Sequence, residues 1–100
     1  MKAIFTTCVS LLLFFAAESY AADAAKGKAK AGMCAGCHGA DGKATIPTYP
    51  HLAGQNSAYL EKQLKEFRNG TRKDPMMNAL AKQLSDDDIA NLAAYYAQMK

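Results

Sequence analysis

Two cysteines and a histidine stand within five consecutive residues of this chain, in the order Cys34-Ala35-Gly36-Cys37-His38. This spacing is typical of covalent haem attachment, in which both thiols add to the porphyrin vinyl groups and the imidazole of the next residue meets the iron. Covalent linkage retains the cofactor and fixes the histidine on one face of the metal. A chain with this motif is therefore expected to fold around one haem c.

Two other kinds of site use the same cysteine spacing. A redox disulfide of the thioredoxin type needs a βαβ context, which this sequence does not offer. A zinc site needs four ligands, and only His38 and His51 are available to join the two cysteines. Haem attachment is the favoured interpretation, with a disulfide or a zinc site as the alternatives.

The start of the chain has the pattern of a secretory signal. Lys2 gives a positive charge, residues 9–17 form an apolar run broken by one serine, and Ser19-Tyr20-Ala21 places small residues where signal peptidase cleaves. We predict cleavage after Ala21, with Ala22 as the alternative. The apolar run is too short to span a bilayer comfortably, so no integral membrane segment is expected once the signal is removed.

Removal of residues 1–21 leaves one small domain, residues 22–100, which we expect to be periplasmic. Cys8 leaves with the signal, so Cys34 and Cys37 are the only thiols of the mature chain. In an oxidising compartment, two thiols this close form a disulfide unless another group takes both. The haem interpretation supplies such a group.

The charge balance excludes one class of partner. The chain has 12 basic and 9 acidic side chains, a formal net charge of +3, and the charges are interspersed. A nucleic-acid-binding domain usually shows a basic stripe with interleaved aromatic residues, and none is present. We therefore expect no nucleic-acid partner.

Helical patterns cover most of the mature chain. Propensity predicts a helix over residues 23–32 that runs into the cysteine motif, and apolar spacing predicts a second over residues 57–69, which stops at Gly70. A capping box at Ser85 predicts a third helix that extends to the C-terminus. Since no strand-like alternation is present, the predicted fold class is all-α, with three or four helices.

Two segments between these helices are less regular. Residues 39–54 contain glycines and prolines without any period, and a loop this long in a small domain is expected to wrap something. Residues 72–75 are interpreted as a turn, and residues 76–84 as either a short helix or an extended lid. The apolar residues form a thin set for a core, so a flat porphyrin would supply the missing interior.

Beyond the haem motif, a series of short motifs resembles class I cytochrome c of the small bacterial, single-haem kind over nearly the whole mature chain. They are Gly27-Lys28, Cys34-Ala35-Gly36-Cys37-His38-Gly39, Asp41-Gly42, Pro50-His51-Leu52-Ala53-Gly54-Gln55, Tyr59-Leu60, Met76-Met77, Leu84-Ser85-Asp86-Asp87-Asp88-Ile89 and Ala94-Tyr95-Tyr96. The resemblance implies three main helices wrapped round one haem, with the first and last crossing near Gly27.

The second face of the iron has several candidate ligands: Met76, Met77, His51, a lysine or water. A methionine is favoured because its thioether is soft and raises the reduction potential, although both methionines are also ordinary candidates for filling gaps in a core. An extended segment after a proline is expected to project the sulfur. The resemblance implies Met77 as the axial ligand, with Met76 as the alternative, and implies that the Pro50 carbonyl accepts a hydrogen bond from His38.

The expected function is single-electron transfer rather than catalysis, with redox partners such as a terminal oxidase, a reductase or a membrane cytochrome complex. A haem enzyme or gas sensor is the rival, and it would need an open distal site. His51 is interpreted as a surface residue or a support for the turn beside His38. Most basic side chains, Arg72 among them, are interpreted as solvated surface, and any that border the haem edge would steer an acidic partner.

Overall fold

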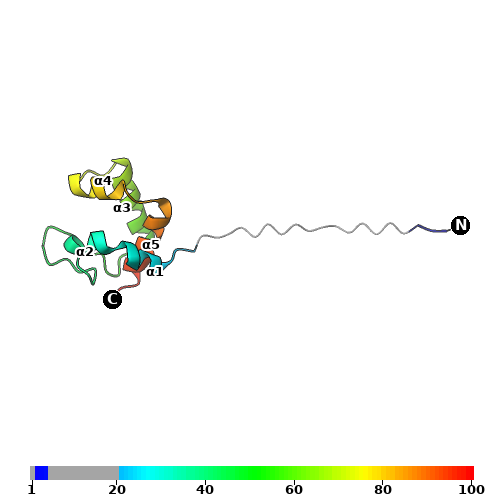
Figure 1. Cartoon of the computed structure of the whole chain (residues 1–100), viewed down its shortest axis with the longest axis horizontal. Helices are drawn as coiled ribbons and strands as arrows, with labels where there is room; N and C mark the ends of the chain where they lie inside the picture. The colour runs from blue at the N-terminus through cyan, green and yellow to red at the C-terminus, as the bar shows by residue number, and fades with distance from the viewer. Residues whose placement is uncertain (1, 5–20) are drawn as a thin grey trace.

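A computed structural model describes residues 2–4 and 21–100 of the chain. The apolar run of the predicted signal peptide lies outside the described residues. The described part forms five helices and no strand, which confirms the all-α prediction (Figure 1). They are α1 (Ala24–Lys30), α2 (Gly32–His38), α3 (Ser57–Asn69), α4 (Pro75–Ala81) and α5 (Asp86–Ala97). None of the helices described is both long and apolar enough to cross a membrane.

The first and last helices, α1 and α5, cross in close contact (Figure 1). A Cβ atom on Gly27 would lie 2.6 Å from the carbonyl carbon of Asn91 and 2.8 Å from Cβ of Tyr95, so only glycine permits this approach. The side chain of Asn91 also accepts a hydrogen bond of 2.8 Å from the backbone N–H of Asp23, which caps α1. The crossing near Gly27 is confirmed.

The predicted first helix is broken. It was expected to run into the cysteine motif without interruption, but α1 ends at Lys30 and α2 begins at Gly32. The backbone N–H of Ala31 bonds to the carbonyl of Lys28, and the N–H of Cys34 bonds to the carbonyl of Ala31. These bonds span three residues instead of four, and this tighter winding separates α2 from α1.

Residues 76–84, for which an extended lid was one alternative, begin with a helix. Asp74 caps α4 through bonds to the backbone N–H groups of Met76 (3.0 Å) and Met77 (2.9 Å), and Pro75 takes the first helical position. An Asp-Pro pair is a common start of a helix, because the acid satisfies free N–H groups and proline has none to satisfy. Of the two alternatives, the short helix is confirmed, and the extended segment from which a methionine sulfur was expected to project is wrong.

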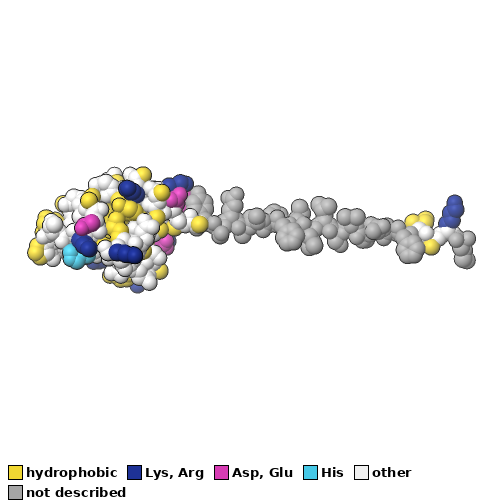
Figure 2. Space-filling view, turned by 90° about the horizontal axis from the view of Figure 1, so that it is seen from below, with side chains coloured by type: hydrophobic (Ala, Val, Ile, Leu, Met, Phe, Trp, Pro, Cys, Tyr) yellow, Lys and Arg dark blue, Asp and Glu magenta, His cyan; other side chains and the backbone are white. Residues whose placement is uncertain are grey.

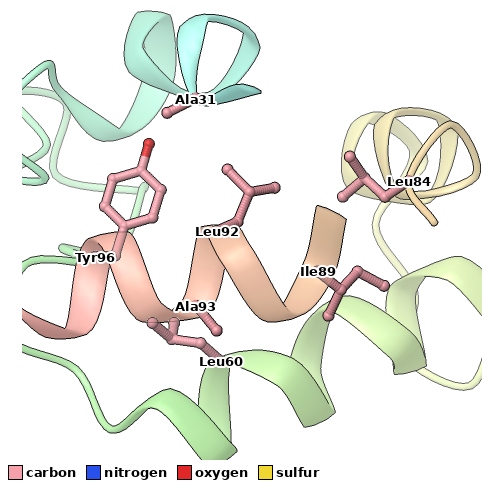
Figure 3. Close-up of a cluster of buried hydrophobic side chains, with 7 residues drawn as sticks. All are labelled: Ala31, Leu60, Leu84, Ile89, Leu92, Ala93 and Tyr96. Atoms are coloured by element: carbon pink, nitrogen blue, oxygen red, sulfur yellow. The ribbon is translucent and has the colours of Figure 1, made fainter. Parts of the chain in front are cut away.

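The buried core is small and centres on α5. Ile89 and Leu92 are the largest side chains that are fully buried, and they pack with Leu60 of α3 (Figure 3). The hydroxyl of Tyr96 points toward Ala31, at the break between α1 and α2 (Figure 3). The last helix thus contacts both α1 and α3, and Cys34 of α2 packs against the same core.

Candidate haem site

A cavity of about 420 Å³ lies between α2 and its following loop on one side and α3, α4 and α5 on the other. Its wall is mainly apolar, with leucine side chains from three helices and the intervening segments. Cavities of a few hundred cubic ångströms with few polar groups are typical of cofactor sites. The predicted site residues all line this cavity: Cys34, Cys37, His38, Pro50, Met76 and Met77.

Helix α2 presents the three residues of the haem motif to this cavity. Cys34, Cys37 and His38 are spaced i, i+3 and i+4, which places them on one face of a helix. Both thiols are free and half-buried. Burial raises the pKa of Cys34 because desolvation disfavours the thiolate, while the hydroxyl of Tyr96 acts in the opposite direction.

His38 is held in a defined orientation. It is buried, with 7 % of its surface exposed, and its Nδ1 lies 2.9 Å from the carbonyl oxygen of Pro50. Because a carbonyl only accepts, Nδ1 carries the hydrogen, and Nε2 of the neutral ring keeps its lone pair. The ring of Tyr49 lies 6.3 Å from that of His38, centroid to centroid. The free nitrogen is therefore the one available to a metal.

The methionines lie on a different helix from His38 and reach the same cavity from the first turn of α4. Met76 is 55 % exposed, whereas Met77 is half-buried. Asn78 fixes this turn, since its side-chain amide donates to the carbonyls of Phe67 and Arg72, each at 2.8 Å. The start of α4 is thereby tied to the end of α3.

Arg72 is exposed, in agreement with its interpretation as solvated surface, but its place at the cavity was not foreseen. Its guanidinium lies 4.5 Å from the ring centroid of Phe67 and donates to Gln63 at 2.7 Å. Both partners also line the cavity. No local signal reveals this placement, because it depends on how the turn after α3 folds back.

His51 also lines the cavity, but it is exposed. Its Nδ1 accepts a hydrogen bond of 2.8 Å from the backbone N–H of Ala44. This contact agrees with the interpretation of His51 as a support within the turn beside His38.

The chemistry of these side chains fits a covalently held haem. Two free thiols on one helix face meet an apolar cavity, and a buried imidazole offers one unprotonated nitrogen beside them. A thioether donor reaches the cavity from another helix. Among residues 2–4 and 21–100, no cluster of three or more His, Cys, Asp or Glu is arranged to hold a metal ion directly. The site thus has the donors of a haem-binding electron-transfer protein.

Comparison with known proteins leads to the same class. The family model for cytochrome c matches residues 24–100, and the chain belongs to this family, as a class I bacterial cytochrome c. Membership implies a covalently bound haem c. The all-α fold with its α1–α5 crossing is the class I cytochrome c fold.

Three similar proteins illustrate the relationship to known cytochromes. The chain is 47 % identical over 83 residues to cytochrome c-554(548) of Halomonas halodenitrificans, covering 80 % of this chain and all of that protein. It is 46 % identical over 95 residues to cytochrome c4 of Pseudomonas aeruginosa, covering 92 % of this chain and 47 % of that one. The structure of reduced cytochrome c4 from Pseudomonas stutzeri superposes with a TM-score of 0.76 and 38 % identity, over 80 % of this chain and 47 % of the other. The chain thus spans about half the length of these cytochromes c4.

Proposed function

We propose that this protein is a periplasmic single-electron carrier with one haem c per chain, and that it is not an enzyme. The observation that carries the proposal is the meeting of Cys34, Cys37, His38 and Met77 at one apolar cavity. The cysteines come from the same helix as His38, and Met77 comes from α4, so the two axial donors are supplied from different elements. A bound haem would supply one-electron redox chemistry there.

Each residue has a distinct task in this proposal. Cys34 and Cys37 would hold the haem through thioether links, and His38 would ligate its iron through Nε2 while the Pro50 carbonyl keeps the other nitrogen protonated. A hydrogen bond of this kind orients the ring and raises its basicity. Met77 is preferred to Met76 because it is the less exposed of two adjacent sulfurs at the cavity. If His38 and Met77 both ligate the iron, they would leave no open position for a small molecule.

Export and partner choice follow from the sequence and the surface. Residues 1–21 would act as a signal peptide cleaved after Ala21 or Ala22, leaving residues 22–100 in the periplasm. Lys and Arg side chains are scattered over the face in Figure 2 among hydrophobic ones, without forming a single patch. This surface suits brief encounters with redox proteins, such as a terminal oxidase, a reductase or a membrane cytochrome complex.

The ligand assignment is tested on protein produced in a host with cytochrome c maturation. The purified protein should show a low-spin spectrum with the sulfur-to-iron charge-transfer band. Met77→Ala should abolish that band, whereas Met76→Ala, the matched change one residue away, should leave it intact.

Two results would contradict the proposal. A high-spin resting iron that readily binds carbon monoxide would indicate an open site and favour a haem enzyme or gas sensor. Colourless protein from the maturation-competent host would favour a disulfide protein instead.

A further inference from the structure

Pro50 lies in the irregular segment between α2 and α3, and its carbonyl must stay in place to bond His38. The base of this segment is closed by the carbonyl of Gly42, which accepts from the backbone N–H groups of Leu52 (2.7 Å) and Ala53 (3.0 Å). Proline has no N–H with which to anchor itself. The position of the Pro50 carbonyl therefore depends on its neighbours.

Beyond this base the segment has few internal anchors. Residues 43–51 contain one backbone–backbone hydrogen bond, which lies within a single turn. His51 adds a link across the segment, because its Nδ1 accepts from the backbone N–H of Ala44 at 2.8 Å. His51 directly follows Pro50 in the chain. Its hydrogen bond therefore joins the start of the segment to its end, close to the bonds that Gly42 accepts.

We propose that His51 is a positioning residue for the axial histidine. Its Nδ1 closes the segment onto Ala44 and thereby holds the Pro50 carbonyl against the Nδ1–H of His38. The proposal rests on the proposed function, because its main effect is transmitted through His38 as an iron ligand. It assigns His51 a part in setting the redox equilibrium without any contact to the iron.

The direction of the effect follows from the hydrogen bond to His38. A firm bond from Nδ1–H to a carbonyl makes the imidazole a stronger donor, and a stronger donor favours ferric over ferrous iron. Loss of the Ala44 link leaves the Pro50 carbonyl free to move, which weakens that bond. The equilibrium then shifts toward ferrous iron.

Two variants with side chains of similar size distinguish the effect of the hydrogen bond from the effect of side-chain packing. His51→Asn keeps an acceptor at the same number of bonds from the backbone, and His51→Leu replaces it with a methyl group. At a fixed electrode potential, the leucine variant should show roughly a fivefold higher ferrous-to-ferric ratio than wild type, as expected for loss of one hydrogen bond's influence. The asparagine variant should stay close to wild type.

A second readout does not depend on redox activity. In the leucine variant, the amide hydrogen of Ala44 and the Nδ1 hydrogen of His38 should exchange with solvent faster than in wild type, as followed by NMR. Both rates should return toward wild type with asparagine. If leucine prevents maturation, His51→Ala also removes the acceptor and permits the same comparison.

Equal ratios and equal exchange rates in the leucine and asparagine variants would overturn the proposal. Failure of the proposed function would look different, since wild type itself would then lack the low-spin spectrum with its charge-transfer band. Even if the proposed function fails in this way, the hydrogen bond from Ala44 to His51 can be tested alone. An Ala44 amide that exchanges at the wild-type rate in the leucine variant would overturn it.

Discussion

The packing of α1 against α5 depends on a missing side chain at Gly27. A Cβ atom at this position would collide with the backbone at Asn91, which belongs to a helix in its interior and cannot easily move. We expect Gly27→Ala to lower the free energy of unfolding by about 1–3 kcal/mol, as for other overpacked sites. Denaturant unfolding followed by circular dichroism measures this change.

Gly32 provides the matched control at the residue scale. It also lies in a helix, but a Cβ atom there would meet nothing within 4 Å. Gly32→Ala should therefore be neutral or stabilising by up to about 1 kcal/mol, because alanine loses less conformational entropy on folding. If the two variants lost equal stability, helix propensity rather than the crossing would explain the effect.

At the scale of elements, the start of α5 is fixed by a reciprocal pair of bonds. The N–H of Asp88 donates to the hydroxyl of Ser85, and the N–H of Ser85 donates to the Asp88 carboxylate, both at 3.0 Å. The bond from the Ser85 N–H lowers the pKa of Asp88, and the charge of Lys30 at 3.6 Å acts in the same direction. The carboxylate therefore contributes more to stability when it is ionised.

The sign of the pH dependence follows from this lowered pKa. The contribution of Asp88 is present above the usual Asp pKa of about 3.9 and is lost as the pH falls through the lower pKa of the folded state. Asp88→Asn should cost about 0.5 kcal/mol near neutral pH. Measured by denaturant unfolding, this difference from wild type should disappear at a pH below the usual Asp range.

Asp87→Asn is the control for that prediction. Asp87 carries the same charge in the same turn of α5, but it makes neither of the reciprocal bonds. Its substitution should remove only the weaker interaction with the helix dipole. If both variants lost stability equally at every pH, the capping box would not be the cause.

The orientation of α4 depends on Asn78. Its amide joins the end of α3 to the turn before α4 through two donated bonds, and its oxygen accepts from the N–H of Asp74 at 2.9 Å. Asn78→Ala should destabilise the protein by about 1–2 kcal/mol, because it removes three hydrogen bonds, of which the one to Phe67 is partly buried. If Met77 ligates the haem iron as proposed, the substitution should also weaken that bond, seen as loss of the sulfur-to-iron band at a lower denaturant concentration than global unfolding.

Asn69→Ala serves as its control, since the Asn69 side chain caps only the exposed N–H of Thr71. We expect a smaller loss of stability and no separate loss of the band. If loss of the band and global unfolding occurred at the same denaturant concentration in both variants, α4 would not depend on Asn78 for its position.

The elements differed in how well the sequence predicts them. α3 and α5 have apolar spacing over three turns together with end signals at Gly70 and Ser85. Both ends of α3 and the start of α5 were predicted within one residue, whereas α5 ends at Ala97 and not at the C-terminus as predicted. α4 has only seven residues, and its start at Asp74-Pro75 was interpreted as part of a turn. Short helices are set by caps and tertiary contacts, so spacing alone leaves them undecided.

For the whole molecule, the sequence predicts the chemistry of the haem site better than it predicts the contacts that hold the site residues in place. The cysteine and histidine spacing indicates haem from five residues, because the chemistry of attachment is local. The hydrogen bond from His38 to the Pro50 carbonyl was predicted from resemblance to a family, and the links through His51 and Arg72 were not specified. Such contacts join positions through folded loops, whose paths cannot be deduced from local pattern.

The size of the cavity that the haem motif lines bears on how the chain folds. Its volume of about 420 Å³ lies within a domain whose buried hydrophobic core comprises few residues. Without a haem, the leucine side chains that line this cavity would face water, so their burial would not contribute to the stability of the fold. A domain has only about 5–15 kcal/mol of stability in total, so such a loss is large in comparison.

We therefore expect the haem-free chain to be largely unfolded. Protein carrying Cys34→Ser and Cys37→Ser should lose most of its helical circular dichroism and expand, as measured by small-angle scattering, because the side chains around the cavity have no partner to pack against. Met77→Ala, which keeps both cysteines and His38, should retain its helical signal and its compact size. A compact, helical double-serine variant that unfolds cooperatively would show that the polypeptide core suffices without the cofactor.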